Sequence, residues 1–242
     1  MEYVLFYLTI LLTHIIQGIT GFAGTLLAMP VSLRLVGVDV AVPVLNGLGI
    51  ASGLYIFLGN RKHVVWKEVG IVLAVMIPFM LGGVFLRNLL KGNTRVLFIV
   101  LGIIVLLLAL KGIYDLFFAK QERPLPKAVR YGALVLAGVV HGMFVCGGPL
   151  LIIYIADRLP KKEEFRATLS TIWMVLDGIL LVTQLISGDW SLPLLKTQLI
   201  ALPVLILAMI IGSLLYKKMS QRLFMIITYI LLLISGISLF FK

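Results

Sequence analysis

The sequence predicts an all-α integral membrane protein built from two homologous halves, each with one broken or re-entrant helix and three transmembrane helices. The 242-residue chain is 61% apolar and only 13% charged, and its mean hydropathy is +1.14. A water-soluble fold of this composition would have too little polar surface. The apolar residues gather in runs of about membrane length, and glycine-rich breaks interrupt two of these runs.

Eight apolar segments lie near the roughly 20 residues that a helix needs to cross a bilayer. They cover residues 3–33, 40–59, 69–86, 96–110, 131–155, 167–187, 197–216 and 223–241. The connector 114–130 is polar and proline-rich, as linkers are. We therefore expect a first membrane repeat at 1–119, a polar linker at 120–130 and a second membrane repeat at 131–242.

The first segment is interrupted at Gly18-Ile-Thr-Gly-Phe-Ala-Gly24, and the fifth at Gly147-Gly148-Pro149. Glycine ends helical order at low cost, and proline is well tolerated as the first residue of a new helix. We expect a half-helix to begin after each break, with its first N–H groups and the positive end of its dipole pointing into the protein. Several transporter folds hold an anion in this way.

The two halves resemble each other when the second is moved back by 124 positions, which places Gly142 on Gly18 and Gly148 on Gly24. Internal duplication with paired broken segments is typical of transporters. If segment 131–155 enters and returns as a hairpin, Lys and Arg divide 15 to 6 between the two sides, whereas eight crossing segments divide them 11 to 10. The positive-inside rule favours the hairpin. The count does not test the first segment, because the leading tail carries no Lys or Arg, but the internal repeat predicts that this segment copies the fifth, which gives halves of inverted topology with both termini outside. A parallel duplication of bent helices stays open as the alternative.

The sequence lacks the motifs that an intramembrane enzyme or an ATP-driven transporter would need. The chain contains neither His-Glu-x-x-His nor Gly-x-Ser-x-Gly, which enzymes of this kind would need, and it contains no ATP-binding P-loop. The net charge of +11 comes from Lys and Arg in short loops, which indicates membrane topology rather than nucleic-acid binding. The one cysteine, Cys146, excludes an internal disulfide and a thiolate metal cluster, and it is most simply a packing residue. We expect no cofactor and no metal.

One face of segment 167–187, together with the residue before it, is polar. Its members share an arc of roughly 60° on a helix and are Arg166, Ser170, Trp173, Asp177 and Gln184. Hydrogen bonds between two helices would account for such a face. Asp177, however, is the only formal charge deep inside a segment, and a buried carboxylate usually faces a cavity or a partner. The equivalent face of the first half is small or weakly polar and would leave room for a ligand; it comprises Val42, Asn46, Gly49, Gly53 and Asn60.

These patterns give two sets of candidate residues. We expect the anion to be bound by Gly21, Gly24, Thr25, Asn46, His141, Gly147, Gly148, Arg166, Ser170 and Trp173. We expect proton coupling at Asp177, His14 and His141, since histidine titrates near physiological pH. A lone membrane histidine can instead be a neutral hydrogen-bonding group between helices. The planar fork of Arg166 suits an oxyanion, but its position at a segment end also suits a charge that sets topology.

The sequences at the two breaks resemble a known family. Gly18-Ile-Thr-Gly-Phe-Ala-Gly-Thr-Leu-Leu-Ala-Met-Pro30 and His141-Gly-Met-Phe-Val-Cys-Gly-Gly-Pro149 are similar to the TauE/SafE sulfite exporter family, also called the toluene sulfonate uptake permease family. The resemblance covers essentially the whole chain and implies transport of sulfite, sulfonates or related sulfur-containing anions across a bacterial inner membrane. The expected partners are a small anionic substrate and the lipid bilayer, with proton coupling and a homodimer as further expectations. An intramembrane enzyme or a membrane scaffold without transport activity is the alternative.

Overall fold

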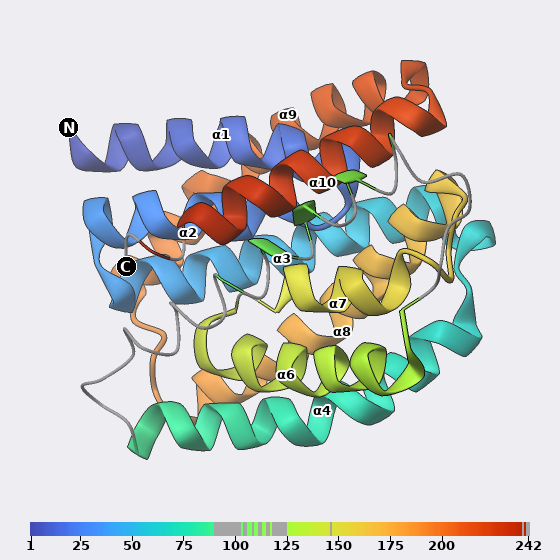
Figure 1. The fold of residues 1–242 in the computed structure, drawn as a ribbon. Coiled ribbons are helices and arrows are strands. Elements are labelled where there is room, and N and C mark those ends of the chain that lie inside the picture. Colours follow the sequence, from blue (N-terminus) through green and yellow to red (C-terminus); the bar gives the residue numbers. More distant parts are fainter. Residues whose placement is uncertain are drawn as a thin grey trace. The chain divides into compact units, whose positions relative to one another are not determined.

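The computed structural model describes residues 1–89, 103, 106–107, 109–110, 113–114, 117, 125–145, 147–238 and 240. Within these residues every regular element is a helix, which confirms the all-α prediction. The elements, labelled as in Figure 1, are α1 (Glu2–Thr20), α2 (Ala23–Val36), α3 (Val38–Asn60), the short 3-10 helix η1 (Arg61–His63), α4 (Trp66–Leu89), α6 (Lys127–Phe144), α7 (Gly148–Ile155), α8 (Lys162–Ile186), α9 (Leu192–Lys218) and α10 (Gln221–Ser238). Most of the predicted segment 96–110 and the start of the predicted linker lie outside the described residues.

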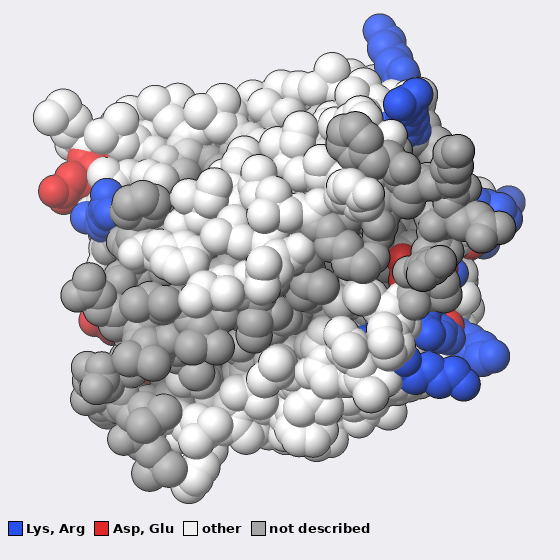
Figure 2. Space-filling model, in the orientation of Figure 1, with Lys and Arg blue, Asp and Glu red and all other residues white. Residues whose placement is uncertain are grey.

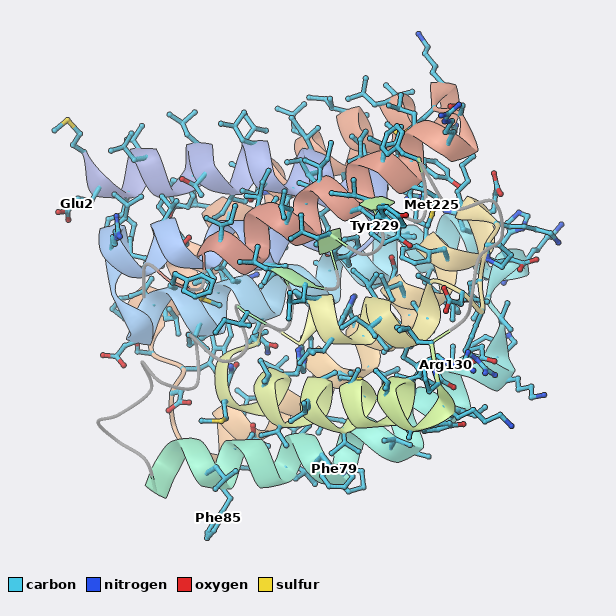
Figure 3. The ribbon with its side chains drawn as sticks, viewed as in Figure 1. Glu2, Phe79, Phe85, Arg130, Met225 and Tyr229 are labelled. Carbon is cyan, nitrogen blue, oxygen red and sulfur yellow. The ribbon has the colours of Figure 1, made fainter. Side chains whose placement is uncertain are left out.

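Five stretches in the described part of the chain are long and apolar enough to cross a membrane: Glu2–Thr20, Asp39–His63, Trp66–Leu86, Lys162–Ile186 and Leu192–Lys218. Large apolar side chains are exposed along them, such as Leu12 on α1 and Phe85 on α4, which points away from its ribbon in Figure 3. Lys217 and Lys218 lie in the last turn of α9, and the described residues on the face that Figure 2 shows are largely uncharged between its left and right ends. The chain is therefore a multi-pass membrane protein.

The chain forms two compact units. Unit 1 comprises Met1–Leu73 and Glu163–Met219, and unit 2 comprises Ala74–Lys162 and Ser220–Lys242. Helices α1, α2, α3, α8 and α9 belong to unit 1, whereas α6, α7, α10 and most of α4 belong to unit 2. Each unit combines residues from the first and the second half of the sequence. The division into two sequence repeats joined by a linker stays a prediction.

Glycine lets α1 and α9 pack closely in unit 1 (Figure 1). A Cβ on Gly18 of α1 would lie 3.0 Å from the Cα of Gly212 on α9, and a Cβ on Gly212 would overlap the carbonyl oxygen of Ile15. Small residues permit such an approach between membrane helices, whose association depends on van der Waals packing. This contact fixes the end of α1, where the first break begins.

Glycines have the same role between α4 and α6 in unit 2. A Cβ on Gly138 would lie 2.8 Å from the carbonyl oxygen of Met76, and a Cβ on Gly142, one turn later, would overlap the carbonyl oxygen of Met80. Two small residues four positions apart are a common device for close helix contact in membranes. The contact fixes the end of α6, where the second break begins.

Candidate functional site

The first break separates α1 from α2 in unit 1. Helix α1 ends at Thr20, and Gly21 then adopts a left-handed conformation with φ 85° and ψ 3°, which favours glycine. The N–H of Gly21 donates to the carbonyl oxygen of Gln17 at 2.8 Å. Helix α2 begins at Ala23, so a new helix N-terminus lies inside the glycine-rich run.

Two side chains of α1 cap the start of α2. The N–H of Gly24 donates to Oε1 of Gln17 at 2.8 Å. The N–H groups of Phe22 and Ala23 each lie 3.4 Å from Oγ1 of Thr20. Both capping residues are buried. Because the first N–H groups of a helix have no partner within it, these side chains satisfy donors that we expected to face a ligand.

His14 borders the same point. Its side chain is fully buried, and Nδ1 donates to the carbonyl oxygen of Ile10 at 2.9 Å. The other ring nitrogen, Nε2, has no hydrogen-bond partner among the described residues. A Cβ on Gly24 would lie 3.2 Å from Cδ2 of His14, the ring atom bonded to Nε2. The start of α2 is therefore flanked by Gln17 and by a buried imidazole edge.

The second break separates α6 from α7 in unit 2. Helix α6 ends at Phe144, and Val145 adopts a left-handed conformation with φ 55° and ψ 33°. Its N–H donates to the carbonyl oxygen of His141 at 2.8 Å. A β-branched residue is rare in this region because its Cβ crowds the backbone. Sequence analysis, which followed the glycines, did not identify Val145; Cys146 lies outside the described residues.

Helix α7 has eight residues, all of them buried. It begins at Gly148, with Gly147 as its N-cap and with Pro149 in its first turn, where proline is favoured. A Cβ on Gly147 would lie 2.8 Å from the Cβ of His141, which is also buried. The second break thus brings His141 against Gly147, the residue before the start of α7.

The predicted polar face of α8 is buried in unit 1. Oγ of Ser170 donates to the carbonyl oxygen of Gly21 at 3.3 Å. Nδ2 of Asn46 on α3 donates to the backbone carbonyl oxygen of Asp177 at 3.1 Å and to Oε1 of Gln184 at 3.3 Å. Trp173, on the same face, is buried as well. These hydrogen bonds join α8 to the first break and to α3.

Arg166 caps the end of α1. Its Nε donates to the carbonyl oxygen of Gly18 at 2.9 Å, and its Nη2 donates to the same oxygen and, at 2.9 Å, to Oγ of Ser213. Its guanidinium carbon lies 4.5 Å from the centroid of the Tyr216 ring. The last carbonyl groups of a helix lack partners and carry its negative end. A cation buried there stabilises the break, a role that sequence analysis did not anticipate.

The carboxylate of Asp177 lies against α3. A Cβ on Gly49 would overlap its Oδ2, and a Cβ on Gly53, one turn later, would lie 2.8 Å from the carbonyl oxygen of Ser170. The small face of α3 therefore meets the polar face of α8. The expectation that these glycines leave room for a ligand is wrong, because α8 fills the space beside both of them.

Two buried polar residues that sequence analysis did not select connect the first break to α3. Nε2 of Gln17 donates to Oγ of Ser52 at 3.3 Å, and Oγ of Ser52 donates to the carbonyl oxygen of Gly49 at 3.0 Å. A lone amide directly before a glycine run is the signal that could have pointed to Gln17.

The predicted site residues are distributed over both units. Unit 1 contains His14, Gly21, Gly24, Thr25, Asn46, Arg166, Ser170, Trp173 and Asp177, and unit 2 contains His141, Gly147 and Gly148.

Comparison with known proteins gives a match to one family across nearly the whole chain. The family model described as Sulfite exporter TauE/SafE matches residues 6–239. The matched region includes both breaks and every candidate residue. No curated protein and no solved structure matches the chain. Among the described residues, no group of three or more His, Cys, Asp and Glu side chains could hold a metal ion.

Proposed function

Because the chain belongs to the TauE/SafE family of sulfite exporters, we propose that it is a secondary transporter of sulfite, a sulfonate or a related small sulfur-containing anion. The family is one of membrane transporters and not of enzymes. It implies a small anionic substrate and a lipid environment. The residues at the two breaks indicate where such an anion would bind.

The first anion site is the N-terminus of α2. The juxtaposition of Gly24 and His14 carries this proposal: the N–H of Gly24, which Oε1 of Gln17 caps, lies at the positive end of a 14-residue helix, and the ring edge of His14 that holds the unpartnered Nε2 lies beside Gly24. N–H groups at a helix start attract anions together with the helix dipole. Thr25, the next residue of α2, is half-buried and adds a hydroxyl at the same end.

The second anion site is the N-terminus of α7. The backbone N–H groups at the start of α7 would meet the ligand there, while α6 packs against Gly147 through the carbonyl oxygen of Ala137 and the Cβ of His141. The left-handed residues Gly21 and Val145 are 124 positions apart, as are Gly24 and Gly148. This correspondence supports two repeats of inverted topology, each with one half-helix whose N-terminus holds the anion near the membrane midplane.

The polar face of α8 positions the first site and couples it to protons. Ser170 and Arg166 hold the end of α1 through Gly21 and Gly18, while Asn46 and Trp173 complete the binding set. Asp177 takes up and releases the coupled proton, with His14 and His141 as the other titrating groups. A carboxylate at membrane depth is costly to keep without a function, and the Asp177 side chain is 4% exposed.

The proposed location is the bacterial inner membrane, with both termini outside and with two copies of the chain in a homodimer. Single-cysteine labelling in a protein freed of its native cysteine checks the topology. Lys162 and Lys218 should be accessible from the cytoplasm, whereas Arg34 and Asp189 should be accessible from outside. Labelling of Arg34 and Lys162 from the same side would contradict the inverted arrangement, because these two residues share a side only if segment 131–155 crosses the membrane.

Counterflow tests the transport activity itself. The purified chain is reconstituted into liposomes loaded with sulfite, and uptake of labelled sulfite is compared with uptake of taurine, sulfoacetate and simple carboxylates. We expect exchange of at least one sulfur-containing anion well above that of protein-free liposomes. Conversion of a sulfur compound without exchange would favour the intramembrane enzyme, and neither exchange nor binding would favour the scaffold.

A further inference from the structure

We infer that Gln17 is an internal ligand, whose side-chain oxygen occupies, in the substrate-free protein, the place at the start of α2 that the substrate anion takes. The inference rests on the proposed function, because it concerns the same anion site. It makes Gln17 the residue that sets the apparent affinity of that site. It also predicts a movement of this side chain in each transport cycle.

The side chain of Gln17 lies across the start of α2. Its Oε1 accepts the N–H of Gly24 at 2.8 Å, and its Nε2 donates to Oγ of Ser52 at 3.3 Å. The N-cap residue of α2, Phe22, makes no side-chain cap hydrogen bond. The capping oxygen therefore comes from a different helix, seven positions earlier. An oxygen held by a helix N–H is also the contact that a bound oxyanion makes.

Gly24 makes this arrangement sterically accessible. A Cβ at this position would lie 2.6 Å from the Cβ of Gln17 and 3.2 Å from its Oε1. Any other residue would push Gln17 away from the N–H that it caps. Glycine at position 24 thus leaves space for one oxygen atom beside the helix start, whether it belongs to Gln17 or to a substrate.

His14 provides an independent sign that a ligand belongs here. Its side chain is 0% exposed, Nδ1 is held by the carbonyl oxygen of Ile10, and Nε2 has no partner among the described residues. Buried polar atoms are nearly always hydrogen-bonded, so an orphaned one calls for an explanation. Because Nδ1 donates, Nε2 of the neutral ring is an acceptor, so it would accept a hydrogen bond from an oxyanion that still carries a proton. It would donate to a fully ionised anion only if a proton enters the ring together with the substrate. Gln17 leaves that nitrogen without a partner.

Two interactions favour an anion over the Gln17 side chain at this position. A charged oxygen forms a stronger hydrogen bond with N–H than a neutral amide oxygen does, and the positive end of α2 adds an attraction that Gln17 lacks. Displacement of Gln17 nevertheless has a free-energy cost. The apparent affinity is reduced by the fraction of protein in which the site is closed.

Two variants test the inference through the thermal stabilisation of the purified full-length protein by sulfite, which grows with concentration relative to the dissociation constant. Gln17→Ala removes the competing oxygen, so the apparent dissociation constant should fall about tenfold. Gln17→Glu keeps the size of the side chain but places a carboxylate at the helix start, so the constant should rise about tenfold or more. Gln198→Ala, which removes another buried amide of unit 1 that packs on Gly47, should change it less than about twofold.

The outcomes separate the inference from the function on which it rests. If Gln17→Glu binds sulfite as tightly as the parent, or if Gln17→Ala binds it more weakly, Gln17 is only a helix cap and the inference is overturned. Should Gln17→Ala fail to fold, the isosteric Gln17→Glu decides alone. If the parent shows neither saturable stabilisation nor counterflow with sulfite or any sulfonate, the proposed function fails and the inference fails with it.

Discussion

The hydroxyl of Ser170 on α8 donates a hydrogen bond of 3.3 Å to the carbonyl oxygen of Gly21, the left-handed residue at which α1 ends. A Cβ on Gly21 would lie only 2.8 Å from Oγ of Ser170 and 3.0 Å from the carbonyl oxygen of Arg166. The first break and the polar face of α8 are therefore in direct contact. Anything that widens this contact should disturb the start of α2.

Gly21→Ala should lower the free energy of unfolding by about 2–4 kcal/mol, because it combines left-handed strain with overpacking against α8. Gly188→Ala is the matched control: Gly188 also has a positive φ, 73°, but a Cβ there meets nothing within 4 Å. The control should lose only about 1–2 kcal/mol, the strain alone. Unfolding of the two variants in detergent measures the difference, and equal losses would show that the contact with Ser170 contributes nothing.

Arg166→Lys should lower the free energy of unfolding by about 1–3 kcal/mol. Lysine has a single ammonium nitrogen in place of the planar guanidinium. It therefore cannot reproduce the hydrogen bonds from two nitrogens to Gly18 and Ser213 together with the stacking on the ring of Tyr216. The lost hydrogen bonds and ring contact account for the expected size.

Arg158→Lys is the control for this prediction. Arg158 also lies over a tyrosine ring, 5.2 Å from the centroid of Tyr154, but it is only half-buried. We expect its loss to stay below about 1 kcal/mol. A similar loss in Arg166→Lys would mean that the cap on α1 adds little to the stability of the break.

The polar face of α8 could be predicted from the sequence because it follows from local geometry alone. Residues spaced by whole helical turns share one side of a helix, and Arg166, Ser170 and Asp177 are all buried on that side. Their partners could not be predicted in the same way. Arg166 contacts Gly18 at a separation of 148 positions, and such a pairing depends on the packing of α1 beside α8.

The residues that sequence analysis missed were hidden for two reasons. Gln17 reaches Gly24 only because α1 and α2 turn sharply between them, and it reaches Ser52 across 35 positions. Val145 takes the conformation that Gly21 takes 124 positions earlier, but its residue type points the other way, since β-branched residues avoid the left-handed region. Val145 is buried in this conformation, against its own preference.

Gly148→Val should weaken substrate binding at least about tenfold while the protein still inserts into the membrane, because the β-branched side chain stands where backbone N–H groups meet the ligand. Gly132→Val, in the same unit, is the control, because a Cβ on Gly132 meets nothing within 4 Å. Thermal stabilisation by the substrate measures binding in both variants. Unchanged binding in Gly148→Val would make the second break a packing device only.

Asp177→Asn should spare folding and counterflow but reduce accumulation driven by a pH gradient. Asparagine keeps the shape of the side chain beside Gly49 and most of its hydrogen bonding, and the backbone carbonyl that accepts from Asn46 is unchanged. It cannot take up or release a proton, so the anion would still exchange across the membrane without being driven by the gradient. Asp189→Asn, which changes an exposed carboxylate just beyond α8, is the control and should accumulate substrate like the parent. Accumulation by Asp177→Asn equal to that of the parent at every pH gradient would make Asp177 structural, and His14 and His141 would then be the next groups to replace.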